Sequence, residues 1–383
     1  MGATQRVSMT DVARRAGVSQ KTVSRVVNGE PHVTEAIRAR VQAAIDEMGF
    51  RPNAAARALV TRRNRRIGMV TPSTSLYGPA SILEGVDGAL RGSGYHLSIA
   101  RTRGDGVADL QAAIDELVAQ DIAGLVLSEP IDLGRPDLRI PHGVPVLSFG
   151  SPKTGSPTAG SAASGPPTAG SPRSDASRTP EAVARPDELV LGADETAGAR
   201  SAVEHLLTLG HRTVHHIGGT EGWSATARRI AGWRAALSDA GVEAPPVVHG
   251  DWTPRSGHEA AVGLLRRAGV TAVFAANDHM AIGAIRAVEQ AGLRVPENVS
   301  VVGFDDAPEA EFLSTPLTTV RQDFAEVTRL AVHRLVGTIE GRPPAERHRL
   351  VPARLIVRES TAPPPSATHR PVRPAGHRSD PRV

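Results

Sequence analysis

The stretch MTDVARRAGVSQKTVSRVVNG, residues 9 to 29, decides the fold of the N-terminal part of the chain. It predicts a first helix that Thr10 caps and Gly17 ends, then a second helix from Val18 to about Asn28 after a very short turn. On the second helix the valines share one face, while polar side chains lie within an arc of about 140° on the other. One face can therefore pack while the other donates hydrogen bonds.

A helix, a tight turn and a second helix with a donor-rich face form a helix-turn-helix arrangement, in which the second helix enters the major groove of DNA. The same pattern also fits a three-helix protein-interaction domain with a solvated face. A third amphipathic helix, with Thr34 as N-cap and Gly49 at its end, completes a predicted domain over residues 1–50. The polar face of the second helix consists of Gln20, Lys21, Ser24, Arg25 and Asn28.

Residues 51–66, RPNAAARALVTRRNRR, connect this domain to the rest of the chain. Pro52 and Asn53 can start a helix, but AAARALV spans only about two turns, below the ~12 residues at which isolated helices become marginal in water. We therefore expect this segment, a hinge helix and linker over 51–65, to be unfolded until a partner holds it. The arginines at its end indicate a solvated linker or contacts with phosphate groups.

Charge is divided unevenly along the 383 residues. Residues 1–66 carry 13 Lys and Arg against 5 Asp and Glu, whereas residues 67–383 carry 31 against 35. Local positive charge is typical of nucleic-acid binding, although solvated surfaces show it too. The chain has no Cys, no signal-peptide pattern and no long uncharged apolar run, so we expect a cytoplasmic protein that has no disulfides and does not bind membranes.

From residue 67 onward, short β-rich runs alternate with amphipathic helical segments, which predicts parallel sheets covered on both faces by helices. The fold class is therefore an all-α helix-turn-helix head followed by an α/β core. The length of the core and a break near its middle favour two doubly wound sheets in two lobes, with a ligand cleft between the lobes beyond the carboxyl ends of the strands. The predicted strands are residues 67–71, 95–100, 122–128, 144–149, 188–192, 212–218, 271–276 and 299–304.

The break spans residues 151–186, where 29 of 36 residues are Pro, Gly, Ser, Thr or Ala. Val183 is the only larger aliphatic residue in it, so the segment cannot bury enough apolar surface to offset its ordering entropy. We expect a disordered insertion there, and a disordered tail over residues 362–383, which are rich in Pro and Arg.

Catalytic patterns are missing from the sequence. It contains no phosphate-binding loop, no dinucleotide-binding glycine motif and no nucleophile elbow, and His258-Glu259 fails the zinc-protease pattern because residue 262 is Val. We therefore expect no enzyme activity, no cofactor and no metal. Two alternatives stay open: a sugar-modifying enzyme fused to a DNA-binding head, and a sugar-binding transport component.

Polar groups do gather at predicted strand ends. Carboxylate, amide and guanidinium groups with an indole face are what a polyhydroxylated ligand needs, because vicinal hydroxyls take paired hydrogen bonds and the C–H face of a sugar packs on an apolar plate. Asn277 and Asp305 equally fit helix caps, and Trp252 equally fits a core position. The candidate residues from this reasoning are Arg229, Trp252, Asn277, Asp305, Gln322 and Phe324.

Taken together, these motifs resemble the lactose-repressor-type (LacI/GalR) family of bacterial transcription regulators. The resemblance covers residues 8 to 360 apart from the insertion. The matching stretches, in chain order, are MTDVARRAGVSQKTVSRVVNG, MGFRPNAAARALV, IGMVTPSTSLYGPA, VEHLLTLGHRTVHHIGG, RRIAGWRAAL, AANDHMAIGAIRA, VPENVSVVGFDD and PLTTVRQDF.

The resemblance implies a homodimer whose paired recognition helices bind a pseudo-palindromic, double-stranded operator. Gln20, Lys21 and Arg25 would face base edges, and Thr22, Ser24 and Asn28 would lie nearer the phosphates. The family's hinge helix, whose leucine is inserted into the minor groove and bends the DNA, matches Pro52, Asn53, Ala56 and Leu59.

The core, by the same resemblance, is similar to periplasmic sugar-binding proteins, with three crossovers between lobes. The N-lobe would comprise about 66–193 and 322–350, and the C-lobe about 194–321 and 351–361, within a core of 66–361. His279 stands where lactose-type members often have Gln, which leaves the identity of the sugar open. The family's ligand positions coincide with the six candidates above and with Leu76, Pro79 and Ile82.

The resemblance therefore implies a DNA-binding repressor of sugar catabolism or transport genes that a small, galactoside-like sugar releases from its operator. The family's tetramers use a leucine heptad helix at the C-terminus, and this tail has no heptads. We accordingly expect a dimer.

Overall fold

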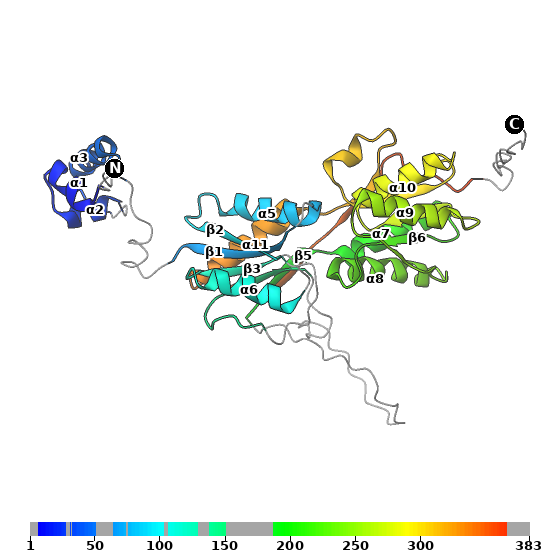
Figure 1. Cartoon of the computed structure of the whole chain (residues 1–383), viewed down its shortest axis with the longest axis horizontal. Coiled ribbons are helices and arrows are strands. Elements are labelled where there is room, and N and C mark those ends of the chain that lie inside the picture. Colours follow the sequence, from blue (N-terminus) through cyan, green and yellow to red (C-terminus); the bar gives the residue numbers. More distant parts are fainter. Residues whose placement is uncertain are drawn as a thin grey trace, which may run out of the picture. The chain divides into compact units, whose positions relative to one another are not determined.

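The structure, a computed structural model, describes residues 7–27, 31, 33–50, 64–73, 76–102, 106–128, 138–150 and 187–365. It divides the chain into two compact units, residues 1–65 and residues 66–383, which are coloured along the sequence in Figure 1. Residues 51–63 of the predicted hinge, the predicted insertion 151–186 and residues 366–383 of the predicted tail lie outside the described residues.

The described part of the first unit consists of helices α1 (Met9–Ala16), α2 (Gln20–Val27) and α3 (Glu35–Met48). The prediction that Thr10 caps α1 is wrong. Ser8 is the N-cap, because its hydroxyl accepts from the Asp11 N–H at 3.3 Å while the Asp11 carboxylate accepts from the Ser8 N–H at 3.0 Å. Gly17 and Gly49 end α1 and α3 with φ of 66° and 61°, as predicted.

One apolar core joins these helices. Val12, Val23 and Val41, one from each helix, are fully buried, and Phe50 closes the core after α3. The buried valine face of α2 fixes its rotation, so its polar face is turned outward.

The described part of the second unit contains two six-stranded sheets. In the first, the order is β11-β5-β4-β3-β1-β2 and all neighbouring strands are parallel. Helices α5 (Tyr77–Leu90) and α11 (Phe324–Ile339) pack on one face and α6 (Val107–Val118) on the other. The strands are β1 (Arg66–Pro72), β2 (His96–Thr102), β3 (Gly124–Leu127), β4 (Val146–Phe149), β5 (Leu189–Ala193) and β11 (His348–Val351).

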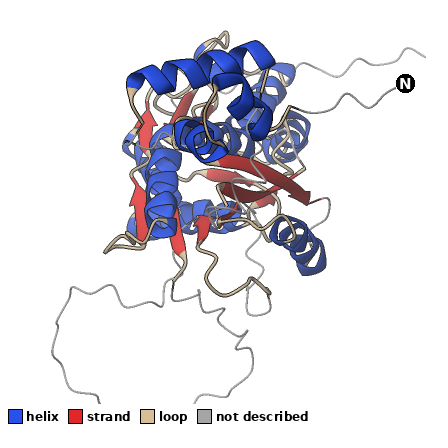
Figure 2. Ribbon diagram, turned by 90° about the vertical axis from the view of Figure 1, so that its left-hand side faces the viewer, coloured by secondary structure: helices blue, strands red, loops and turns tan. Residues whose placement is uncertain are grey.

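The second sheet has the order β12-β10-β9-β8-β6-β7, and only the β10–β12 pair is antiparallel. Helices α7 (Glu195–Thr208) and α8 (Ser224–Asp239) cover one face, while α9 (Pro254–Leu265) and α10 (Asp278–Gln290) cover the other. Figure 2 shows helices in blue on both sides of the strands in red. The strands are β6 (His215–Gly218), β7 (Val248–His249), β8 (Ala272–Ala275), β9 (Ser300–Asp305), β10 (Thr318–Arg321) and β12 (Arg354–Ile356).

The chain passes between the sheets three times: after β5, after β10 and between β11 and β12. Two sheets with helices on both faces confirm the predicted fold class. Strands β7, β10, β11 and β12 are not among the eight predicted strands, because each is only two to four residues long and has at most two consecutive apolar residues. Of the expected tail, residues 362–365 are described, and Ala362 exchanges hydrogen bonds with the Ser300 hydroxyl at 3.0 Å.

In the part of the chain that the structure describes, no helix is both long and apolar enough to cross a membrane. No group of three His, Asp or Glu side chains among the described residues is arranged to hold a metal ion.

Candidate functional site

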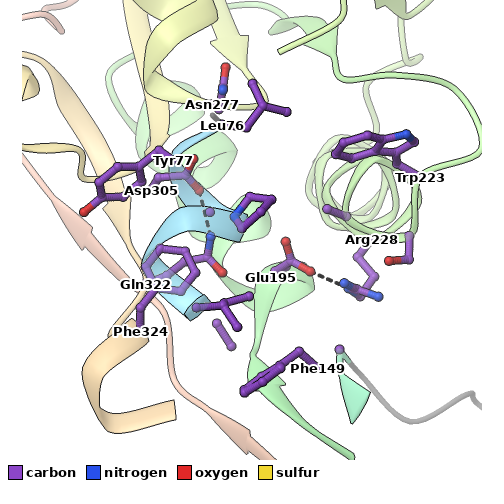
Figure 3. Close-up of a pocket in the computed structure, with 18 of the residues that line it drawn as sticks. Leu76, Tyr77, Phe149, Glu195, Trp223, Arg228, Asn277, Asp305, Gln322 and Phe324 are labelled. Carbon is purple, nitrogen blue, oxygen red and sulfur yellow. Dashed lines mark hydrogen bonds and ion pairs between the residues drawn. The ribbon is translucent and has the colours of Figure 1, made fainter. Parts of the chain in front are cut away.

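A cavity of about 130 Å³ lies between the two sheets of the second unit, at the carboxyl ends of their strands. The crossovers after β5 and β10 place Ala193, Glu195 and Gln322 in its wall. The structure brings all nine predicted ligand residues into this one lining, and Figure 3 shows several of them. They are Leu76, Pro79, Ile82, Arg229, Trp252, Asn277, Asp305, Gln322 and Phe324.

Arg229 is the centre of the charged part of the cavity, and 5% of its surface is exposed. Its Nε and Nη2 atoms donate to Glu195 Oε1 at 3.1 and 2.7 Å, Nη1 donates to the Ala276 carbonyl, and Nη2 lies 3.4 Å from Asp305 Oδ1. Four of the five guanidinium N–H groups are therefore directed at protein acceptors. A paired fork from Arg229 to ligand hydroxyls does not fit this arrangement.

The pKa values of the two carboxylates in this network are shifted in opposite directions. Burial opposes the ionisation of Glu195, but Arg228 and Arg229 outweigh it and hold the pKa of Glu195 below its ordinary value. Burial raises the pKa of Asp305 to about 6, against the opposing effects of Arg229 and of Gln322, whose Nε2 donates to Asp305 Oδ1 at 2.7 Å. Asp305 is thus the lining group whose charge changes close to neutral pH.

Asn277 serves both as a helix cap and as part of the lining. Its Oδ1 accepts from the Met280 N–H at 2.9 Å at the start of α10, and its Nδ2 donates to the Trp252 carbonyl at 3.1 Å. Trp252 has a positive φ of 72° and is 5% exposed. Its ring packs closely over Gly219, where an added Cβ would lie 2.1 Å from the indole.

The remaining predicted residues lie on or directly before the two helices α5 and α11 of the first sheet and form an apolar wall of the cavity. Leu76 precedes α5, and Pro79 and Ile82 lie in its first turns. Phe324, at the start of α11, meets Tyr77 edge to face with ring centroids 5.9 Å apart. A polar network on one side and an apolar wall on the other suit a small ligand that has both hydroxyls and C–H surface.

The sequence reasoning missed thirteen residues of the lining, and among them Glu195, Trp223 and Arg228 carry a charge or an indole ring. Glu195 follows β5, so a search of every strand end would have found it. Arg228 is the neighbour of a residue that was chosen, and Trp223 is the N-cap of the same helix, α8. Their approach to one cavity depends on packing between distant segments, which spacing alone does not reveal.

The candidate nucleic-acid surface is on α2 of the first unit. Gln20 and Lys21 are exposed, whereas Thr22, Ser24 and Arg25 are half-buried. The Thr22 hydroxyl lies 2.9 Å from the Ser19 hydroxyl at the start of the helix. The other predicted DNA contacts, Asn28, Asn53, Ala56 and Leu59, and the helix-starting Pro52, lie outside the described residues.

Comparison with known proteins supports both units. Residues 8–53 match the model of bacterial regulatory proteins of the lacI family, and residues 203–361 match the periplasmic binding protein-like domain. The chain is 31% identical to the lactose operon repressor of Escherichia coli K12 over 366 residues, which is 95% of this chain and 93% of that protein. The chain belongs to the lacI family. It is 34% identical to the transcriptional regulator CelR of Thermobifida fusca, over 93% of this chain and 98% of that regulator.

Solved structures of lacI-family proteins share the fold. The lac repressor dimer bound to operator and an anti-inducer matches 94% of this chain and 100% of that chain, with a TM-score of 0.77 and 29% identity. The CelR–cellobiose complex matches 93% of this chain and 100% of that chain, with a TM-score of 0.63 and 32% identity. The protein is therefore a DNA-binding transcriptional repressor of the lacI family with a sugar-binding type of core, and not an enzyme.

Proposed function

We propose that this protein binds a pseudo-palindromic operator as a homodimer and that a small neutral sugar, galactoside-like in its hydroxyl pattern, releases it. The gathering of the nine predicted ligand residues around one cavity is the observation that carries this proposal. Asp305 and the last N–H of Arg229 would bind ring hydroxyls, and the apolar wall would contact C–H groups. The regulated genes would encode proteins for sugar catabolism or sugar transport.

Coupling to DNA would follow from the three crossovers. Because Gln322 lies on one crossover and Glu195 on another, a ligand held between the sheets favours one relative orientation of the lobes. In the proposed dimer, that orientation sets the spacing of the two heads. A coupling free energy of about 1–3 kcal/mol would change operator affinity roughly 5- to 150-fold.

The test is a gel-shift titration of the full chain on DNA from the region upstream of its own gene and neighbouring genes. The sugars to be compared follow from the lactose and ribose operon repressors and from the CelR–cellobiose complex, with maltose as a further disaccharide. Methyl β-galactoside, ribose, maltose and cellobiose are added separately, with nonspecific competitor DNA present. We expect one of them to weaken operator binding by about fivefold or more. If none of the sugars, nor an extract of plant polysaccharide hydrolysate, alters binding, the proposed release by sugar is wrong.

Effector affinity should fall in acid solution. The sugar hydroxyls would bind the ionised form of Asp305, whose pKa is raised to about 6, so below that pH the protein must first lose a proton. Affinity for the releasing sugar is expected to be constant above about pH 7 and to fall up to about tenfold per unit below pH 6. Calorimetric titrations from pH 5 to 8 measure this, and Asp305→Asn should bind weakly but without the pH dependence. A wild-type affinity that is flat over this range would contradict the role of Asp305.

The hinge residue Leu59 provides a test on the DNA side. If it is inserted between base pairs at the operator centre, Leu59→Ala should weaken operator binding by about tenfold or more. Binding to nonspecific DNA should change little, because that binding depends on phosphate contacts. Gel-shift titrations with operator and with scrambled DNA compare the two, and equal losses on both would refute the inserted position.

A further inference from the structure

Two of the lining residues that the sequence reasoning missed form one corner of the cavity. Trp223, the N-cap of α8, and Arg228, within α8, both line it. Figure 3 shows them on one side of the cavity with Glu195 and Phe149, while Asn277, Asp305 and Gln322 lie on the other. This corner is called the α8 corner below and is defined by Trp223 and Arg228.

Trp223 offers a better surface for a sugar ring than Trp252 does. Trp252 is 5% exposed and its indole Nε1 is buried without a hydrogen-bond partner among the described residues. Gly219 and the Arg229 guanidinium, 5.4 Å from the ring centroid, lie against it. Trp223 is only half-buried and packs on Trp252 at a centroid distance of 5.5 Å. Trp252 is therefore a support, and Trp223 is the indole that a ligand can reach.

Arg228 presents hydrogen-bond donors toward the same corner. Its Nε donates to Glu195 Oε2 at 2.5 Å, and its side chain is 21% exposed. Its two terminal nitrogens have no hydrogen-bond partner among the described residues, and Nη1 lies 3.7 Å from the position that a Cβ on Gly150 would take. Glu195 is 7% exposed and bound to both arginines, so it holds the guanidinium in place.

From these contacts we propose that the α8 corner determines which sugars the repressor accepts. Trp223 stacks on the C–H face of a pyranose, and Arg228 donates to an oxygen of the same ring or of its substituent, a hydroxyl or a carboxylate. Glu195 acts as the positioning residue for Arg228. This inference deepens the proposed function and rests on it.

The chemistry of the guanidinium sets the direction of selectivity. It has N–H donors and no acceptor, and it keeps its charge at every physiological pH. A ligand group opposite Arg228 must therefore accept hydrogen bonds, and an ammonium group there is repelled in a cavity of low dielectric constant. The α8 corner thus admits neutral and acidic sugars and rejects amino sugars.

Two sugars of opposite charge test this selectivity: galacturonate and 6-amino-6-deoxygalactose, with methyl β-galactoside as the neutral reference. Calorimetric titration of the full chain at pH 7 is expected to show at least about tenfold tighter binding of the acid than of the amine. In Arg228→Gln this ratio should fall by about tenfold. Arg234→Gln, which removes an exposed arginine from the same helix, should leave the ratio as in the wild type.

The stacking part of the inference has its own variants. Trp223→Ala should weaken the binding of methyl β-galactoside by about tenfold. Trp223→Phe should retain most of the wild-type affinity, because an aromatic face remains. Each variant is first checked for wild-type circular dichroism and operator binding. An unchanged acid-to-amine ratio in Arg228→Gln, or wild-type affinity in Trp223→Ala, overturns the inference while sugar binding itself stands. If the wild type binds no sugar at all, the proposed function fails and the inference with it.

Discussion

Replacing Arg229 by alanine is expected to abolish the effector response and to lower the free energy of unfolding of the second unit by about 3–5 kcal/mol. Arg229 is almost fully buried and binds Glu195, Asp305 and the Ala276 carbonyl. Without it, Asp305 loses its cationic partner and Glu195 keeps only Arg228, so buried carboxylate charge remains without compensation. The loss of ligand binding and the loss of stability thus have one cause.

Tryptophan fluorescence measures the predicted loss in the free energy of unfolding of the second unit. The chain has three Trp residues, Trp223, Trp233 and Trp252, and all of them lie in the second unit. Urea titrations followed by their emission therefore report that unit alone. Operator binding at low temperature should persist, because the helices of the head have their own core.

Arg200→Ala is the matched control for Arg229→Ala. Arg200 also pairs with two carboxylates, Glu204 and Asp239, but its side chain is 45% exposed, and water screens such pairs. Its urea midpoint and sugar response should stay close to those of the wild type. If the urea midpoints of Arg229→Ala and Arg200→Ala are equal, the buried network around Arg229 does not stabilise the cavity.

The head and the sheets could be predicted from the sequence because their signals are local. Gly17 and Gly49 end their helices because each adopts the left-handed conformation at the C-cap, and the run TAVFAA forms a buried strand. The error at Thr10 is also local, since Ser8 and Asp11 form a capping box that competes with it. Local sequence patterns therefore predict most helices and strands, and the errors are in their boundaries and in the shortest strands.

Part of the cavity lining could be predicted from the sequence, but the contacts within it could not. Strand-end reasoning and family resemblance together chose residues that the structure places around one cavity. The guanidinium fork of Arg229 is occupied by Glu195, which lies on the crossover after β5, and is not left open for ligand hydroxyls. Ion pairs between segments 34 residues apart leave no periodic trace in a sequence, so the network could only be found in three dimensions.

Gly283→Ala is expected to destabilise the second unit by about 3 kcal/mol or more, although alanine is favoured over glycine in helices by about 1 kcal/mol. Gly283 is buried in α10, where an added Cβ would lie 1.9 Å from the Pro254 carbonyl oxygen and 2.7 Å from the His258 nitrogen of α9. Both are backbone atoms, so no side-chain rotation relieves the clash and the helices must separate.

That separation would reach the cavity as well as the core. Helix α10 begins beside Asn277 and α9 begins just after Trp252, and the two residues are joined by the hydrogen bond from Asn277 Nδ2 to the Trp252 carbonyl. Moving the helices apart strains this bond, so sugar affinity should fall together with stability. Gly263→Ala is the control, since Gly263 is exposed on α9 and its Cβ would meet no atom within 4 Å. In urea titrations followed by Trp emission, the midpoint of Gly263→Ala should equal or slightly exceed that of the wild type. If Gly283→Ala has the same midpoint as Gly263→Ala, the close contact between α9 and α10 does not order this side of the cavity.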